Sequence, residues 1–116
     1  MDRVSNTTKR YRKIVEAVLT EIHNYISSGP YQNRDRKLFD RHSDSYAIIE
    51  EYWENGQHIH DILIHLEIIN DKVWIQADNT DLIIAHELEQ AGIPKTDIVL
   101  GFHPPHIRPL TEYAAA

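Results

Sequence analysis

The segment Lys72–Phe102 constrains the fold more than any other part of this sequence, because signals for a strand and a helix follow each other closely. Its first residues alternate between apolar and more polar side chains, which predicts a β-strand over residues 72–77. Apolar residues then recur at helical spacing, which predicts a helix over residues 81–91 with Thr80 as its N-cap. Gly92 suits the left-handed position that commonly ends a helix. These signals describe a fold and contain no reaction centre.

An amphipathic helix is predicted near the N-terminus, over residues 8–27. Its apolar side chains keep to one stripe along the helix. The stripe consists of Tyr11, Ile14, Val15, Val18, Leu19, Ile22, Tyr25 and Ile26. Ser28, Gly29 and Pro30 end this helix, and a polar loop is predicted over residues 30–36.

Three further strands are predicted over residues 37–40, 45–53 and 58–69. Asn-Gly at 55–56 and Asn70-Asp71 are typical of two-residue hairpin turns. In the longest strand the predicted apolar face consists of Ile62, Ile64, Leu66 and Ile68. The sequence therefore predicts an α+β fold, in which an antiparallel β-meander from about residue 37 to 77 packs against the N-terminal helix and the second helix. The tail from residue 103 contains three prolines, so we expect it to be extended or irregular.

Composition bounds the class of protein. The chain has 116 residues, which is enough for one domain over residues 1–116 and too few for a second core. It has no cysteine, which excludes disulfides, thiolate catalysis and cysteine-type zinc sites. No apolar run approaches the roughly 20 residues of a membrane helix, and the N-terminus lacks the apolar core of a secretory signal. We therefore expect a cytoplasmic protein with no membrane partner.

The net charge of −6 is unevenly distributed. Residues 1–41 hold nine of the 12 lysines and arginines but only five of the 18 acids, and the remaining residues hold three basic and 13 acidic side chains. Lys9, Arg10, Arg12 and Lys13 crowd the first turns of the predicted helix, where they are candidate phosphate contacts. A solvated helix face explains this cluster better, because no aromatic or glycine residues are interleaved with it.

Eight histidines in a chain of this length raise the hypothesis of a metal site. His58 and His60 lie two residues apart on a predicted strand and so share a face. Such a pair supplies two imidazoles to zinc, iron or copper, with Glu50 or Glu51 of the neighbouring strand as a candidate third ligand. No fixed third ligand is readable, so a metal-dependent enzyme is kept as an alternative and we assign no metal.

Other reaction centres are not indicated by the sequence. The chain has no nucleophile elbow, no phosphate-binding glycine loop and no metal-dependent nuclease motif, so we expect no catalytic residues and no cofactor. Trp53 and Trp74 are candidate platforms for base stacking, although tryptophans on strands of small domains more often serve the core or an interface.

The sequence resembles the XisI family, small cyanobacterial proteins named as controlling factors for excision of the fdxN DNA element. The resemblance covers nearly the whole chain and is most specific over residues 72–114. The matching residues there are Val73-Trp74-Ile75-Gln76, Asp78, Thr80, Ile84-Ala85, Glu87-Leu88, Gly92-Ile93-Pro94-Lys95, Asp97 to Phe102, Pro105, Arg108 and Thr111 to Ala114.

This resemblance implies a non-enzymatic regulatory protein in site-specific DNA recombination, acting beside a recombinase and a second accessory protein, XisH. Binding to a XisH-like protein is the implied mode of action, and the acidic residues 42–116 suit a basic, nucleic-acid-handling partner. Direct DNA binding through the basic N-terminal helix is the alternative, although a negative protein without a recognition motif argues against it.

The tail is expected to serve packing and association. Its apolar residues exceed what one small meander and two helices are expected to cover, and exposed apolar patches mark association surfaces. We therefore predict a homodimer whose interface includes residues between 98 and 113, with Arg108 as a polar contact at its rim.

Overall fold

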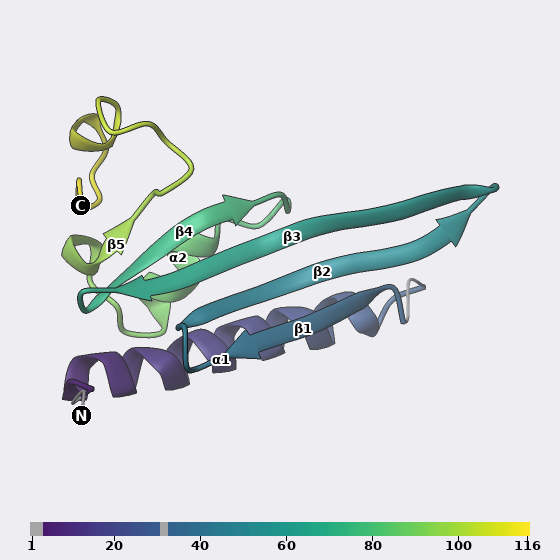
Figure 1. Ribbon diagram of the computed structural model, residues 1–116, viewed down its shortest axis with the longest axis horizontal. Helices are drawn as coiled ribbons and strands as arrows, with labels where there is room; N and C mark the ends of the chain where they lie inside the picture. The colour runs from purple at the N-terminus through teal and green to yellow at the C-terminus, as the bar shows by residue number, and fades with distance from the viewer. Residues whose placement is uncertain (1–3, 31–32) are drawn as a thin grey trace.

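The computed structural model describes residues 4–30 and 33–116, so part of the loop predicted over residues 30–36 lies outside the described residues. The elements follow the order α1 (Asn6–Ser27), β1 (Asp35–Asp40), β2 (Ser45–Glu54), β3 (Gln57–Ile69), β4 (Lys72–Asp78), α2 (Ile84–Gln90) and β5 (Ile98–Val99). Two short 3-10 helices follow α2, at Lys95–Asp97 and Arg108–Leu110. Figure 1 shows the long β2–β3 hairpin reaching past the other strands and the C-terminal segment looping out beside β5.

The five strands form one sheet in the order β1-β2-β3-β4-β5. The first four pair antiparallel, which confirms the predicted meander and the α+β class. The fifth strand was not predicted as a strand, and it pairs with β4 in parallel through Ile98 and Val99. The chain protects this edge itself, because Ala114 donates its backbone N–H to the carbonyl of Ile98 at 2.9 Å.

Both predicted hairpin turns are confirmed by their backbone angles. Asn55 and Gly56 have φ values of 52° and 74°, and Asn70 and Asp71 have values of 51° and 62°. Two consecutive positive φ values are typical of the type I′ turn, whose twist matches that of the flanking strands. The turn residues therefore fix the register of both hairpins.

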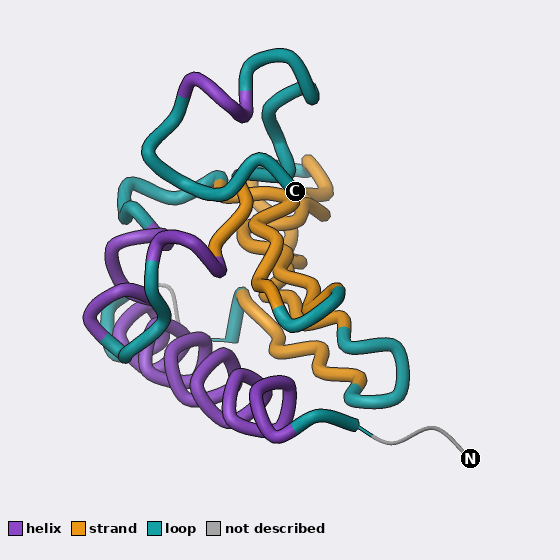
Figure 2. The backbone as a smooth tube through the Cα atoms, turned by 90° about the vertical axis from the view of Figure 1, so that its left-hand side faces the viewer, coloured by secondary structure: helices purple, strands orange, loops and turns teal. Residues whose placement is uncertain are grey.

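The core lies between the sheet and the two α-helices, which both cover the same face (Figure 2). The apolar stripe of α1 and the inward side chains of the strands meet there, and α2 adds Ile84, Ala85 and Leu88. Tyr25 was predicted to belong to the stripe, and this is wrong, since it is 74% exposed beside the start of the α2 segment. The opposite face of the sheet carries no α-helix in the described part of the chain (Figure 2).

The prediction that Thr80 caps the second helix is wrong. α2 begins at Ile84, three residues later than predicted, and the residue in its N-cap position makes no side-chain hydrogen bond. Instead Asp78 Oδ2 accepts the backbone N–H of Ile84 at 3.1 Å, while Thr80 Oγ1 accepts that of Leu82 at 3.2 Å. The Asp78 carboxylate thus accepts a backbone N–H at the start of α2 from six residues upstream, and a turn occupies the residues between Asp78 and Ile84.

Candidate functional site

The sheet face opposite the α-helices is left uncovered by any α-helix of the described residues (Figure 2). Cross-strand register places Leu38 beside Ala47 and His65, and Arg36 beside Ile49 and Ile62. We call this surface the open face. It comprises Arg36, Leu38, Asp40, Ser45, Ala47, Ile49, Glu51, Trp53, His58, His60, Ile62, His65, Glu67, Ile69, Lys72 and Trp74.

A β-bulge in β3 turns one predicted core residue outward. The pairing with β2 shifts between Ile48 and Ile49, which face Ile64 and Ile62, so Leu63 is the extra residue. Because side chains alternate strictly along a strand, one extra residue exchanges the two faces beyond it. Ile62 was predicted to face the core with Ile64, and this is wrong, since it is 47% exposed while Leu63 packs against the core.

The two histidines considered as metal ligands lie at the end of the open face near the β2–β3 turn. Their rings stack with centroids 5.7 Å apart, and His58 also stacks on Trp53 at 4.6 Å. The Nε2 of His58 lies 2.8 Å from Glu51 Oε2, so one of the glutamates named as a third ligand does reach it. Within residues 4–30 and 33–116, however, no three histidine, aspartate or glutamate side chains are arranged to hold a metal ion.

Trp74 and Arg108, two candidate contact residues 34 positions apart, meet at the other end of the open face. The Arg108 guanidinium lies 4.8 Å from the centre of the Trp74 ring, and its Nε donates to the carbonyl of His103 at 3.0 Å. The tail backbone comes close to the sheet at Gly101, where a Cβ would lie 2.5 Å from Gln76 Oε1 and 3.1 Å from Trp74. The tail is therefore fixed against the sheet, with Arg108 held in a cation–π contact.

The basic cluster of α1 divides into two kinds of residue. Lys9, Arg10 and Lys13 are exposed. Arg12 instead lies in a bidentate ion pair, donating from Nε and Nη2 to the two carboxylate oxygens of Asp44 at 2.6 and 2.9 Å. Both side chains are 17% exposed, so this arginine ties α1 to the turn between β1 and β2.

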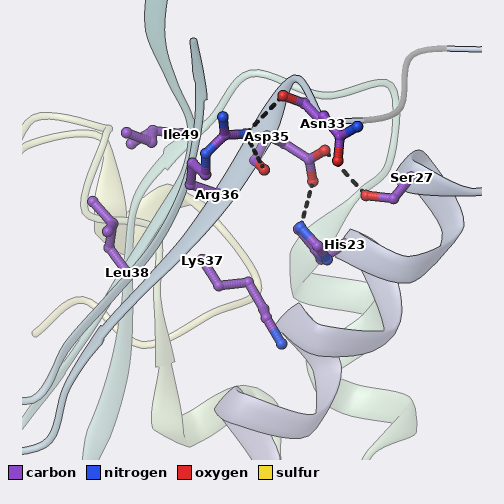
Figure 3. A pocket seen from close by; sticks show the side chains of 8 residues that line it. All are labelled: His23, Ser27, Asn33, Asp35, Arg36, Lys37, Leu38 and Ile49. Carbon is purple, nitrogen blue, oxygen red and sulfur yellow. Dashed lines mark hydrogen bonds and ion pairs between the residues drawn. The ribbon is translucent and has the colours of Figure 1, made fainter.

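A polar cluster that was not predicted from the sequence lies in an open hollow at the β1 edge (Figure 3). Asp35 is buried, at 4% exposure, and accepts a hydrogen bond from Ser27 Oγ at 3.2 Å. His23 Nε2 lies 3.2 Å from the other carboxylate oxygen. His23 and Ser27 are four residues apart on α1, a spacing that places them on one side of the helix and was readable from the sequence.

This cluster is not a nucleophilic triad. Serine and histidine both contact the carboxylate, so the imidazole is not placed to take a proton from the hydroxyl. The arrangement joins the end of α1 to the start of β1, and Arg36 completes it by donating to the carbonyls of Asn33 and Asp35 at 2.7 and 3.1 Å. We interpret this cluster as structural.

Carboxylates gather on the helix side of the β2–β3 hairpin. Glu50 is paired with Asp61 across the two strands, and Asp35 lies nearby in the same hollow as Glu50. Burial, followed by the charge of Asp61, raises the pKa of Glu50. Among the described residues, neither Glu50 nor Asp61 has a side-chain hydrogen bond or ion pair. Arg34 lines the same hollow and its charge lowers the pKa of Glu50, so this side of the hairpin holds more carboxylates than cations.

The described residues thus offer surfaces for association, and among them we find no arrangement of nucleophile, base and orienting group. Large apolar side chains are exposed both on the open face and on the tail. They include Leu38, Trp53, Ile62, Phe102 and Leu110. No helix in the described ranges is long and apolar enough to cross a membrane.

Comparisons with known proteins agree with this description. The family model described as XisI protein matches residues 1–115. The crystal structure of the fdxN element excision controlling factor XisI from Anabaena variabilis ATCC 29413 superposes with a TM-score of 0.84 at 36% identity, covering 96% of this chain and 100% of that one.

A XisI-like protein from the same strain also has a TM-score of 0.84, at 31% identity, covering 94% of this chain and 99% of that one. No curated protein matches the chain. The resemblance noted over nearly the whole chain is therefore confirmed by a family match over residues 1–115 and by the whole fold. The chain belongs to the XisI family.

Proposed function

We propose that this protein is a non-enzymatic accessory protein that controls excision of a DNA element by binding a protein partner of the XisH type. It acts in the cytoplasm, as a homodimer, without a cofactor. One of its structural relatives is named as an excision controlling factor, and that relative is matched over its full length. The observation that carries partner binding is the excess of acidic side chains in residues 42–116, while the large apolar side chains exposed on the uncovered sheet face and on the tail support self-association.

Charge supports a basic partner over direct DNA binding as the main mode of action. Residues 42–116 carry 13 acids against three basic residues, and Glu50 and Asp61 lie beside the β2–β3 hairpin with Arg34 as a nearby cation. A negative surface attracts a positively charged, nucleic-acid-handling protein and repels phosphate. Complementary charge of this kind speeds encounter and makes the affinity depend on salt.

The experiment is a pull-down of a XisH-like protein by the tagged chain, followed by titration calorimetry at several salt concentrations. We expect a stoichiometric complex whose affinity falls as salt rises, because screening weakens the attraction between opposite charges. Absence of a complex at micromolar concentrations, at low salt and with both proteins folded, would contradict the proposal.

Direct DNA binding is a second candidate, favoured by the three exposed basic residues of α1. Its test is the salt dependence of DNA affinity for a variant in which Lys9, Arg10 and Lys13 are all replaced by glutamine. Each lost phosphate contact lowers the salt slope by about 0.9. We expect the slope to stay unchanged, and a clear fall would favour the DNA-binding candidate. Arg12 is left in place because it is engaged with Asp44.

A further inference from the structure

The centre of the open face is apolar, and its charged groups are few and nearly balanced. Leu38 is 53% exposed and Ile62 is 47% exposed, on either side of the half-buried Ile49. The two basic side chains, Arg36 and Lys72, are nearly balanced by one aspartate and two glutamates. Of these glutamates, Glu51 contacts His58 and Glu67 accepts a hydrogen bond from Gln76. Apolar side chains at the centre with polar groups around them are typical of a protein–protein interface.

We propose that the open face is the homodimer interface, and that a second copy of this chain packs its own open face against it about a two-fold axis near Ile49. This inference rests on the proposed homodimer and is independent of the XisH-like partner. In such an isologous dimer each contact occurs twice, so a residue beside the axis meets its own counterpart. The tail contributes only where Arg108 lies on Trp74, at one end of the face.

The area of the face suits a dimer. β2 has ten residues, and ten residues at about 3.3 Å each, across four strands about 4.8 Å apart, give on the order of 600 Å² in projection. The accessible surface of a corrugated sheet exceeds its projection, so it approaches the roughly 800 Å² per partner of a standard interface. Two sheets stack face to face about 10 Å apart, with their inner side chains interdigitating.

Charge selects a second copy over a basic partner for this surface. The open face holds one arginine and one lysine against one aspartate and two glutamates, with three histidines, whereas the whole chain has a net charge of −6. A basic partner finds little complementary charge here and more on the helix side of the hairpin, where Glu50 and Asp61 lie. A second copy brings an equally balanced surface, so stacking the two faces incurs little repulsion.

The test compares charged substitutions by light scattering coupled to size-exclusion chromatography, on the full chain. The double variant Leu38→Glu/Ile62→Glu is expected to be a monomer, because four carboxylates enter the apolar centre of the dimer. Ile83→Glu and Leu110→Glu are matched controls at positions that are 57% and 80% exposed and lie outside the open face, and both are expected to stay dimeric. Circular dichroism and the thermal midpoint check that every variant folds.

The outcomes separate this interface from the homodimer itself. A monomeric wild type would overturn the homodimer and this inference with it. A dimeric wild type that persists in the double variant, or that dissociates on Leu110→Glu alone, would overturn only the open face as the interface. In the second case the tail holds the dimer.

A second measurement needs no charged substitution. The chain has no cysteine, so Ile49→Cys introduces a single thiol. On mild oxidation this variant is expected to form a disulfide-linked dimer, because the two thiols lie beside the axis, while the control Ile83→Cys stays uncrosslinked. Equal crosslinking of both variants, or of neither, would contradict the proposed packing.

Discussion

Replacing Arg12 with alanine is expected to destabilise the fold, whereas replacing its exposed neighbour Lys13 is not. Arg12 donates two hydrogen bonds to Asp44, at 2.6 and 2.9 Å, and one to the carbonyl of Arg41 at 3.1 Å. Hydrogen bonds to charged groups contribute about 1.5–3 kcal/mol each, and the loss of one partner of a fully buried pair costs about 3–5 kcal/mol. Asp44 keeps the hydroxyl of Tyr46 as a donor, at 2.9 Å.

Because both charged side chains are 17% exposed, water replaces part of what is lost, and we expect a cost of about 2–3 kcal/mol for Arg12→Ala. For a chain of this length that corresponds to a fall in Tm of roughly 8–12 °C. Lys13→Ala is expected to change the stability by less than about 0.5 kcal/mol. Urea denaturation followed by circular dichroism measures both, and equal losses for the two variants would refute the structural role of Arg12.

The pH dependence of stability provides a second test of the Arg12–Asp44 pair. Burial raises the pKa of Asp44, but the hydrogen bonds from Arg12 and Tyr46 outweigh it, so that the pKa lies below its ordinary value of 3.8. A carboxyl whose pKa falls on folding contributes stability above the unfolded value and loses it as pH drops through the folded value. The stability difference between wild type and Arg12→Ala is therefore expected to narrow below about pH 4. A difference that stays constant down to pH 2 would contradict this.

Further substitutions test the tail and the acidic side of the hairpin. Gly101→Ala places a Cβ against Gln76 and the rigid Trp74 ring, so we expect a loss of about 1–3 kcal/mol in urea denaturation, and an unchanged midpoint would show that the tail does not pack there. Glu50→Gln is expected to raise stability at neutral pH by a few tenths of a kcal/mol, because the pKa of Glu50 is raised and its ionised form is disfavoured in the fold. Glu21→Gln, at an exposed position, is the control. The pKa shift of Glu50 is opposite in direction to that of Asp44, so the gain in stability should vanish once acid protonates Glu50. A loss of stability at pH 7 would contradict the burial argument.

Local signals in the sequence predicted most of the fold. The two hairpin turns need residues that tolerate positive φ, and asparagine, aspartate and glycine stand there. The apolar stripe of α1 and the alternation in β4 each reflect one buried face, so periodicity alone located them. The parallel pairing of Ile98 and Val99 with β4 was not predicted, because two residues are too few to show a period.

What the sequence could not predict depends on contacts between distant residues. The bulge at Leu63 turns Ile62 outward, yet nothing in the local pattern distinguishes a bulged strand from a regular one. Arg12 was grouped with its basic neighbours because Asp44, 32 residues away, could not be paired with it in advance. The contact of Trp74 with Arg108 likewise arises only when the tail folds back onto the sheet.

The measurement that tests the central claim most directly is the mass of the complex between this protein and a XisH-like protein, by light scattering coupled to size-exclusion chromatography. The account predicts a complex that contains two copies of this chain, and one copy when Leu38 and Ile62 are both replaced by glutamate, with the partner retained in each case. Two folded proteins that elute separately at low salt would contradict the account. So would a complex that loses its partner when only the open face is changed.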